Sequence, residues 1–506
     1  MKHDTLAAVD LGSNSCHLQI GRVVDQQIYL LDNFREPVRL GAGLTRDKRL
    51  DRATQLRALE ALGRFGERLR GFPREAVRAV GTNVLRVAKN RDQFLAEAEA
   101  VMGFPVEVVF GREEARLIYL GVAHSLPPLQ DRRLVVDVGG GSTELIIGTG
   151  MEPELVESVS IGCVSYGLKF FAGGTLEKTA FKAAELAAAN QLQRIVKAYR
   201  QAGWRHAVAS SGTAKALANI LRENGWSGGS ITGGGLRELR SQLIKAGDTG
   251  RLRDKARIPG LREDRIDILP GGLAIMLALM AELEIDELEP SEGGLRQGVL
   301  YDLLGRVRHQ DMREATVGEF ARRYHVDTAQ AARVGQLAAM LYTAVVTDVP
   351  DAHGQLLRWA ASLHEIGISI AHAGYHKHSA YIISQADMPG FSQMEQGHLA
   401  RLVLAHRGKL AKVAGLAPED PDWALIFALR LAVLFSLRRT DMDVSQIECQ
   451  ASGSGYEITL LRTWLDEHPL TEAALEAEAE EWNALGMNFA IRALHGDQAR
   501  AASAGQ

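Results

Sequence analysis

Cysteine is scarce in this sequence, and long apolar runs are absent. The three cysteines, Cys16, Cys163 and Cys449, are far apart and form no metal-ligand spacing, so each is expected to be a small core residue in a reduced compartment. No apolar run reaches the roughly 18 residues that a membrane-spanning helix needs. The N-terminal residues enter a strand-like run without the apolar segment of a secretory signal. We therefore expect a cytoplasmic protein with no integral membrane span, and leave peripheral membrane association open.

A strong charge of one sign is also missing. The net charge of −4 over 506 residues argues against a nucleic-acid-binding protein and against a surface-wide site for polyanions. Affinity for a polyanion must then come from local basic segments, although most such segments are solvated helix faces. The candidates, taken as a group, are residues 251–257, 306–309, 322–323 and 401–412. The chain is long enough for about two to four domains.

Two glycine-rich turns, each opened by an aspartate at the end of an apolar run, are the most informative feature that is present. The first spans residues 10–15 and reads DLGSNS, and the second spans residues 137–144 and reads DVGGGSTE. Each turn is followed by another strand-like run. A strand, a tight turn and a returning strand, written twice, predict two related lobes whose turns face each other.

The chemistry of both turns suits a phosphate chain. Glycine adopts positive φ without a Cβ penalty, so consecutive amide N–H groups can point into one concavity and bind an anion, with hydroxyl and amide side chains as further donors. One such turn alone would favour an ordinary hairpin, whereas two with hydroxyls in matching places favour phosphate binding. The candidate phosphate-binding residues of the two turns are Asp10, Gly12, Ser13, Asn14, Ser15, Gly139, Gly140, Gly141 and Ser142.

Carboxylates beside these turns predict a divalent cation. Asp10 and Asp137 would repel phosphate unless Mg²⁺ lies between them and the phosphate, and Mg²⁺ binds one or two carboxylates together with phosphate oxygens and water. Glu144 lies two residues after Ser142 on the returning strand, so it shares a face with Ser142 and is a candidate to join Asp137 at the metal.

Two further segments carry candidate residues. Glu113 and Glu114 fall in the first turn of a helix expected from Gly111 onward, where the helix dipole favours negative charge. We expect Glu113 to cap the helix and Glu114 to be the catalytic candidate, because a carboxylate beside bound phosphate can act as general base towards water.

The segment around residues 77–90 predicts a strand that ends at Gly81 and a helix that follows it. Thr82 and Asn83 near the helix start, and Arg86 one turn later, are candidate phosphate ligands. A capped surface helix with a solvated arginine is an equally good interpretation of this segment alone. Arg39 is a weaker candidate of the same kind.

Four motifs in this order, AAVDLGSNSCHLQI, GTNVLRVAKN, GREEARLIYLG and VVDVGGGSTEL, resemble the exopolyphosphatase and guanosine pentaphosphatase family. That family belongs to the actin, Hsp70, sugar kinase and acetate kinase fold group. Its members hydrolyse the terminal phosphate of inorganic polyphosphate processively and require Mg²⁺. The resemblance places the catalytic glutamate on Glu114 and the metal-associated acids on Asp137 and Glu144. It also makes a homodimer plausible and leaves stimulation by K⁺ open.

The resemblance implies an α/β fold of two actin-like (ribonuclease H-like) lobes, a mostly helical third domain and a small C-terminal α+β domain. We place the lobes at residues 1–124 and 125–310, the helical domain at 311–446 and the last domain at 447–506. The third domain resembles HD-type phosphohydrolases, but Glu365 stands where aspartate is expected. His378, His398 and His406 are therefore expected to be hydrogen-bonded structural residues rather than ligands, in a domain that binds polyanion. We expect structural roles for two more segments: Ser210–Thr213 in the lobe core, and Glu292 paired with Arg296.

An exopolyphosphatase is the leading hypothesis, with inorganic polyphosphate as its partner. The alternative is hydrolysis of guanosine-5′-triphosphate,3′-diphosphate, which motifs alone do not separate from it. A polyphosphate-dependent phosphotransferase and a non-catalytic sensor of polyphosphate or guanosine tetraphosphate remain less favoured. The transferase would need an acceptor site, and the sensor would not need Glu114, Asp137 and Glu144 together.

Overall fold

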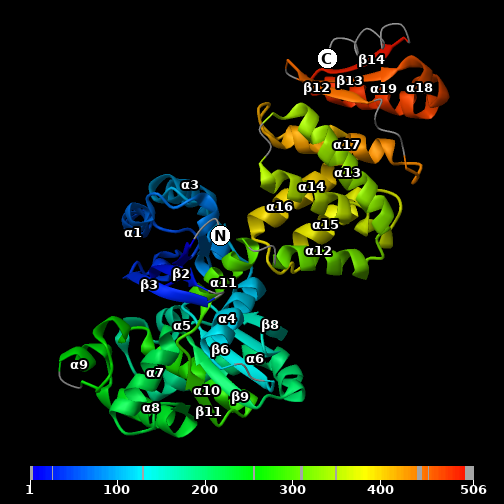
Figure 1. Cartoon of the computed structure of the whole chain (residues 1–506). Coiled ribbons are helices and arrows are strands. Elements are labelled where there is room, and N and C mark those ends of the chain that lie inside the picture. Colours follow the sequence, from blue (N-terminus) through cyan, green and yellow to red (C-terminus); the bar gives the residue numbers. More distant parts are fainter. Residues whose placement is uncertain are drawn as a thin grey trace. The chain divides into compact units, whose positions relative to one another are not determined.

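The computed structural model describes residues 4–24, 27–127, 130–254, 257–307, 311–347, 350–441, 447–453 and 455–495. It has two compact units, one of Met1–Met312 with Pro389–Gln393 and the other of Arg313–Met388 with Met394–Gln506. The first unit contains two β-sheets, and the second contains a helical region and a small sheet (Figure 1).

The first sheet has the strand order β3-β2-β1-β4-β5. Strands β1, β2 and β3 form an antiparallel meander, whereas β4 pairs with β1 in parallel and β5 pairs with β4 in parallel. Parallel neighbours need a crossover connection, and helices α1, α2 and α3 provide it. The bounds are β1 Thr5–Leu11, β2 Cys16–Val24, β3 Gln27–Glu36, α1 Arg52–Leu69, β4 Val77–Gly81, α2 Asn83–Val87, α3 Arg91–Met102 and β5 Val106–Val108.

The second sheet repeats this topology. Its order is β10-β11-β9-β6-β7-β8, so β8, β7, β6, β9 and β11 take the places of β3, β2, β1, β4 and β5. The duplication expected from the two turns therefore extends to the whole sheet. The bounds are β6 Arg132–Val138, β7 Thr143–Thr149, β8 Glu152–Val159, α5 Cys163–Phe170, α6 Lys178–Ala202, β9 His206–Ser210, α7 Ser211–Glu223, β10 Ile231–Thr232, α8 Gly233–Ala246, α9 Thr249–Asp254, α10 Leu269–Leu283 and β11 Glu287–Pro290.

Helix α4 (Gly111–Ser125) lies between the two sheets. Its residues Ile118 and Val122 are buried with Val135 and Val208 of the second sheet. Leu117 is buried instead with residues of β1 and β4 and with helix α11 (Leu295–Val307). Burial on both sides fixes α4, and with it the candidate base Glu114, at the junction of the lobes.

Helix α11 packs closely on α4, although its residues come from the C-terminal end of the second lobe's segment. A Cβ on Gly298 would lie 1.7 Å from the Leu117 carbonyl oxygen, and one on Gly121 would lie 2.0 Å from the Gly294 carbonyl oxygen. Glycine is required on both helices at this contact, because any side chain would push them apart.

Among its described residues, the second unit has the α-helices α12 to α17 followed by the sheet β12-β13-β14 with α18 and α19. The bounds are α12 Met312–Arg323, α13 Thr328–Val345, α14 Asp351–Leu363, α15 Tyr375–Gln385, α16 Gln393–Ala405, α17 Asp422–Phe435, β12 Glu448–Ser452, β13 Gly455–Leu461, α18 Arg462–Glu467, α19 Pro469–Asn483 and β14 Phe489–Leu494. Short 3₁₀ segments connect elements in both units, at Leu40–Gly43, Arg74–Ala76, Ala172–Gly174, Glu263–Arg265, Ile366–Ser369 and Leu410–Val413.

The expected fold class is confirmed at this level: two α/β lobes, a helical region and a small final sheet. The four domain boundaries and the HD-like character of the helical region stay predictions. No helix within the described ranges is long and apolar enough to cross a membrane.

Candidate active site

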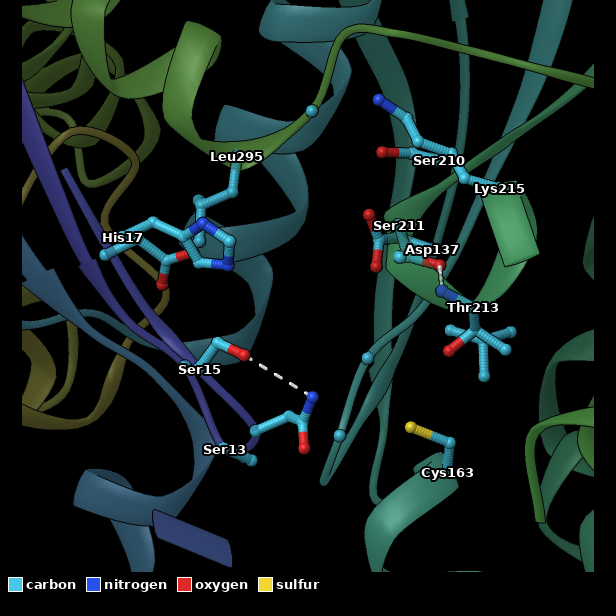
Figure 2. A pocket seen from close by; sticks show the side chains of 18 of the residues that line it. Ser13, Ser15, His17, Asp137, Cys163, Ser210, Ser211, Thr213, Lys215 and Leu295 are labelled. Atoms are coloured by element: carbon cyan, nitrogen blue, oxygen red, sulfur yellow. Dashed lines mark hydrogen bonds between the residues drawn. The ribbon is translucent and has the colours of Figure 1, made fainter. Parts of the chain in front are cut away.

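The two glycine-rich turns meet at one cavity of about 650 Å³ within the first unit. Figure 2 shows Ser13 and Ser15 on one wall of the cavity and Asp137 on the opposite wall. The tips of the turns touch, since a Cβ on Gly140 would lie 2.7 Å from the Ser13 Cβ. A Cβ on Gly141 would lie 2.3 Å from Asn83 Oδ1, which brings the third candidate segment to the same place.

The backbone of both turns is oriented by segments behind them. The carbonyls of Ser13 and Asn14 accept hydrogen bonds from Gly41 and Arg39 at 2.7 and 2.8 Å, and those of Gly139 and Gly140 accept them from the start of α5 at 2.9 Å. In a trans peptide the next N–H points away from the carbonyl. The N–H groups that follow, from Asn14, Ser15, Gly140 and Gly141, therefore point away from the backing segments. This arrangement suits an anion on the cavity side.

The structure brings nearly all of the predicted site residues to this cavity. The lining includes Asp10, Gly12, Ser13, Asn14, Ser15, Thr82, Asn83, Glu114, Asp137, Gly139, Gly140, Gly141 and Ser142. Arg86 and Glu144 are not part of the lining. Both lie immediately behind it, because Arg86 contacts Glu114 and Glu144 lies opposite Asp137 on the neighbouring strand.

Asp137 and Glu144 form a cross-strand pair, so their carboxylates share one face of the second sheet. Burial is the main cause that raises the pKa of Asp137 to about 6. The charge of Glu114 also raises this pKa, whereas a hydrogen bond from Ser210 lowers it. Burial also raises the pKa of Glu144 well above its usual range, with the charges of Glu114 and Asp137 adding to the effect. Ser158 Oγ donates to Glu144 at 2.8 Å and fixes its orientation.

Asp10 faces the same cluster from the first sheet. Burial raises its pKa to about 7, although Arg296 lowers it, and the charges of Glu114 and Asp137 raise it again. Its Oδ1 atom is buried and has no hydrogen-bond partner among the described residues. An acceptor in this state is unfavourable unless a cation or donor satisfies it.

These acids fit a divalent cation. Within the described ranges, no group of three or more His, Cys, Asp or Glu side chains is placed to hold a metal. Mg²⁺ needs only one or two carboxylates when phosphate oxygens and water complete its shell. The unsatisfied Asp10 oxygen and the mutual repulsion of Asp10, Asp137 and Glu114 would both be relieved by a cation between the lobes.

Glu114 projects into the cavity from the first turn of α4 and forms a 2.6 Å ion pair with Arg86. Arg86 also donates to the Val109 carbonyl at 3.1 Å, so the arginine is held on the side of Glu114. Glu113 points elsewhere. The expected capping role of Glu113 is replaced by a bidentate pair with Arg116 at 2.8 Å in a buried network, since no side chain caps this helix.

The cavity also has residues that were given structural roles or no role from the sequence. The expected Glu292–Arg296 pair is wrong: Glu292 binds Lys215 at 2.6 Å, and Arg296 lines the cavity. Ser210–Thr213 also line the cavity rather than only the lobe core, and a Cβ on Gly212 would collide with the Arg265 guanidinium at 2.3 Å. Other lining cations and amides, which no motif indicated, are Asn33, Arg35, Asn219, Arg262 and Arg265.

His17 belongs to the same wall, beside Leu295 in Figure 2. Burial, together with the charges of Arg296, Arg35 and Arg265, lowers its pKa to about 3, so the imidazole stays neutral. The sequence held a signal that His17 belongs to the cavity. It lies two residues after Ser15, at the start of β2, and alternate side chains of an extended segment face the same side.

Several members of the basic segments are paired with acidic side chains of their own unit. Arg253 pairs with Asp267, Arg306 binds Asp302 in a buried network, Arg323 pairs with Glu319, and Arg401 pairs with Asp422. Lys255, Arg308 and His309 lie outside the described residues. The Arg39 side chain is exposed, and this residue contributes its backbone N–H to the first turn.

Two of the candidate histidines of the second unit are hydrogen-bonded within the protein. His406 is buried and binds the Val403 carbonyl through Nδ1 at 2.6 Å, and His398 binds Asp422 at 2.6 Å. Glu365 pairs with Arg439 at 2.6 Å. These bonds confirm that His398 and His406 are hydrogen-bonded as expected, while the prediction that neither they nor His378 are metal ligands stays a prediction.

Comparison with known proteins agrees with this architecture. Residues 19–307 match the Ppx/GppA phosphatase family, and residues 312–479 match domain III of the Ppx/GppA phosphatases. The crystal structure of the Aquifex aeolicus family member is 28% identical, with a TM-score of 0.51, over 60% of this chain and 99% of that one. An exopolyphosphatase from Cytophaga hutchinsonii is 25% identical, with a TM-score of 0.54, over 60% of this chain and 98% of that one. With the family match covering more than half of its residues, the chain belongs to the Ppx/GppA phosphatase family.

Proposed function

We propose that this protein is an exopolyphosphatase, which removes the terminal phosphate of inorganic polyphosphate by Mg²⁺-dependent hydrolysis. The observation that carries the proposal is the convergence of two amide-bearing turns and the Glu114 carboxylate on one cavity. Amide donors bind a phosphate terminus, and a carboxylate beside it can activate water.

Each group has a task in the reaction. The turn amides and the hydroxyls of Ser13, Ser15 and Ser142 hold the terminal phosphate in place. Glu114 accepts a proton from the attacking water, and Arg86 keeps the Glu114 carboxylate in one orientation through their ion pair. Displacement at phosphorus depends mainly on positioning and on neutralising charge, which are the tasks that these residues divide among them.

Asp137 and Glu144, with Asp10 facing them, would hold Mg²⁺, which when bound neutralises the charge of the phosphate oxygens. Arg296 lies near Asp10 and Asp137, and its charge offsets part of the increase that burial causes in the pKa of both carboxyl groups.

Membership of the family supports further proposals about the helical region, the oligomeric state and the location of the protein. The helical region is HD-like without a metal centre and helps to retain long chains, which would make hydrolysis processive. The active protein is a homodimer in the cytoplasm.

A direct assay compares phosphate release from long polyphosphate and tripolyphosphate, with and without Mg²⁺. Wild type should release phosphate only with the cation. Glu114→Ala should lower kcat about 100-fold or more while polyphosphate binding and folding are kept, because a positioned base contributes about that factor. Glu60→Ala, which removes an exposed glutamate of α1, is the matched control. Equal turnover in Glu114→Ala would show that another group activates water.

Hydrolysis of guanosine-5′-triphosphate,3′-diphosphate is the second candidate. It is favoured by the amide side chains of Asn33 and Asn219 and the apolar side chains of Ile118 and Leu295, which line the same cavity and suit a nucleoside. A higher kcat/KM for this nucleotide than for polyphosphate would favour it. Transfer of phosphate to ADP in place of release to water would contradict both candidates.

A further inference from the structure

A short segment from far along the chain reaches the two elements that carry Glu114 and Arg86. Residues Pro389–Gln393 belong to the first unit, whereas the residues before and after them belong to the second. They also lie within the part of the chain that matches domain III of the family. We call Pro389–Gln393 the strap.

One end of the strap binds the first turn of α4. The N–H of Gly390 donates to Glu113 Oε2 at 2.9 Å, and Glu113 is the residue next to Glu114. The Gly390 carbonyl accepts from Arg306 Nη2 at 2.7 Å. Gly390 has φ of 88°, a left-handed conformation that favours glycine, and its N–H and carbonyl both have partners in that conformation.

The bonds at this end close into a ring. Glu113 binds Arg116, Arg116 binds Asp302, Asp302 accepts from Arg306 Nε at 3.1 Å, and Arg306 returns to Gly390. Glu113, Arg116 and Asp302 are almost completely buried, and Arg306 is largely buried. Arg78 adds a further 2.7 Å bond to Asp302. A buried ring in which every member is bonded resists displacement, because moving one member leaves a buried charge unpaired.

The other end of the strap binds the segment that follows Arg86. The Gln393 Oε1 atom accepts from Arg91 Nη1 at 2.9 Å. The same Arg91 nitrogen reaches the carbonyl of Leu85, the residue before Arg86, at 3.5 Å. The strap therefore connects Glu113, the residue before Glu114, with Leu85, the residue before Arg86, through the Arg91 side chain.

We infer that the strap is a positioning element for the Glu114–Arg86 pair. It ties α4 to the α2–α3 connection, and thereby sets the separation at which the two side chains form their 2.6 Å contact beside the phosphate turns. Gln393 and Glu113 are positioning residues in this sense: they act through Arg86 and Glu114 and do not line the cavity. The inference rests on the proposed function, in which Glu114 activates water.

Gln393→Ala in the full chain is the test, since Gln393 is only half-buried and its loss should not unfold the protein. The expected result is a fall in kcat of about 10-fold with KM for polyphosphate within about twofold of wild type, as expected for a displaced catalytic group. Gln393→Glu keeps an acceptor for Arg91 and should restore kcat to within about twofold of wild type. Gln93→Ala, which removes an exposed glutamine two residues after Arg91 on α3, is the matched control and should leave kcat unchanged.

Hydrogen exchange provides a second readout that needs no turnover. Without substrate, Gln393→Ala should exchange faster than wild type and Gln93→Ala at the amides of α2 and of the first turn of α4, with the same melting temperature. Unchanged kcat together with unchanged exchange at these amides would overturn the inference, as would a failure of Gln393→Glu to restore either. A wild type that releases no phosphate would contradict the proposed function alone, and the exchange comparison would still decide whether the strap holds these elements.

Discussion

At the scale of single residues, buried carboxylates from both lobes face one another at the lobe junction. Asp137 is 8% exposed, and burial raises its pKa to about 6 from an ordinary value of 3.8. The folded chain therefore holds this proton more tightly than the unfolded chain does. Stability contributed by the protonated form is present at low pH and is lost as the pH rises through about 6.

The first prediction concerns Asp137→Asn, which removes this titration. Without divalent cation at pH 8, the variant should exceed wild type in the free energy of unfolding of its unit by about 1–3 kcal/mol. The difference should vanish near pH 4, where the wild-type carboxyl group is protonated. Denaturant titrations at both pH values measure it. Adding Mg²⁺ should stabilise wild type more than the variant, and an unchanged difference between pH 4 and pH 8 would contradict the assignment.

Residue roles were predictable where they depend on local pattern. The turn residues, Asp137 and Glu114 all line the cavity because each lies in or beside a tight turn or a helix start, whose geometry follows from neighbouring residues. The place of Arg296 in the cavity was not predicted, because the spacing indicated a pair with Glu292. In the structure Glu292 binds Lys215 of a different helix instead. Such a choice between partners depends on tertiary structure and leaves no trace in sequence spacing.

At the scale of elements, the close contact of α4 and α11 is decisive for the position of Glu114. Glycines on both helices let the backbones approach, so that the Leu117 carbonyl lies where a side chain on Gly298 would begin. The topology of each lobe could be predicted from the repeated hairpin. The return of α11 to the first lobe could not, because its apolar pattern would suit either sheet.

The second prediction is that Gly298→Ala destabilises the protein by about 1–3 kcal/mol, as overpacking does, despite alanine's better helix propensity. Since α4 would have to move, kcat should fall as well. Gly63→Ala on α1, where a Cβ meets nothing within 4 Å, is the control and should stabilise by about 0.5–1 kcal/mol. Equal denaturation midpoints for the two variants would contradict the packing argument.

At the scale of the whole molecule, the chain divides into two units with separate cores, and the first contains the complete cavity. Molecules of several domains commonly unfold in more than one step. A ligand then raises only the transition of the unit that binds it, by an amount that grows with its concentration relative to its dissociation constant.

The third prediction uses calorimetry of Glu114→Ala, in which turnover is suppressed. Tripolyphosphate with Mg²⁺ should raise one of two thermal transitions by several degrees and leave the other within about one degree. Long polyphosphate should raise both, because we propose that the helical region helps to retain long chains. If long polyphosphate raises only one transition, the helical region does not bind the substrate and this part of the proposal is wrong.

The contact between the tips of the two hairpins has a consequence for how a polymer can be read. Ser13 and Gly140 meet, and Gly41, Gly162 and Val164 back them so tightly that a methyl group would not fit on any of these glycines or on Gly140 without displacement. A phosphate chain therefore cannot pass between the two tips. Under the proposed function, the tips would meet a free end of polyphosphate, so cyclic polyphosphate, which has no end, should not be a substrate.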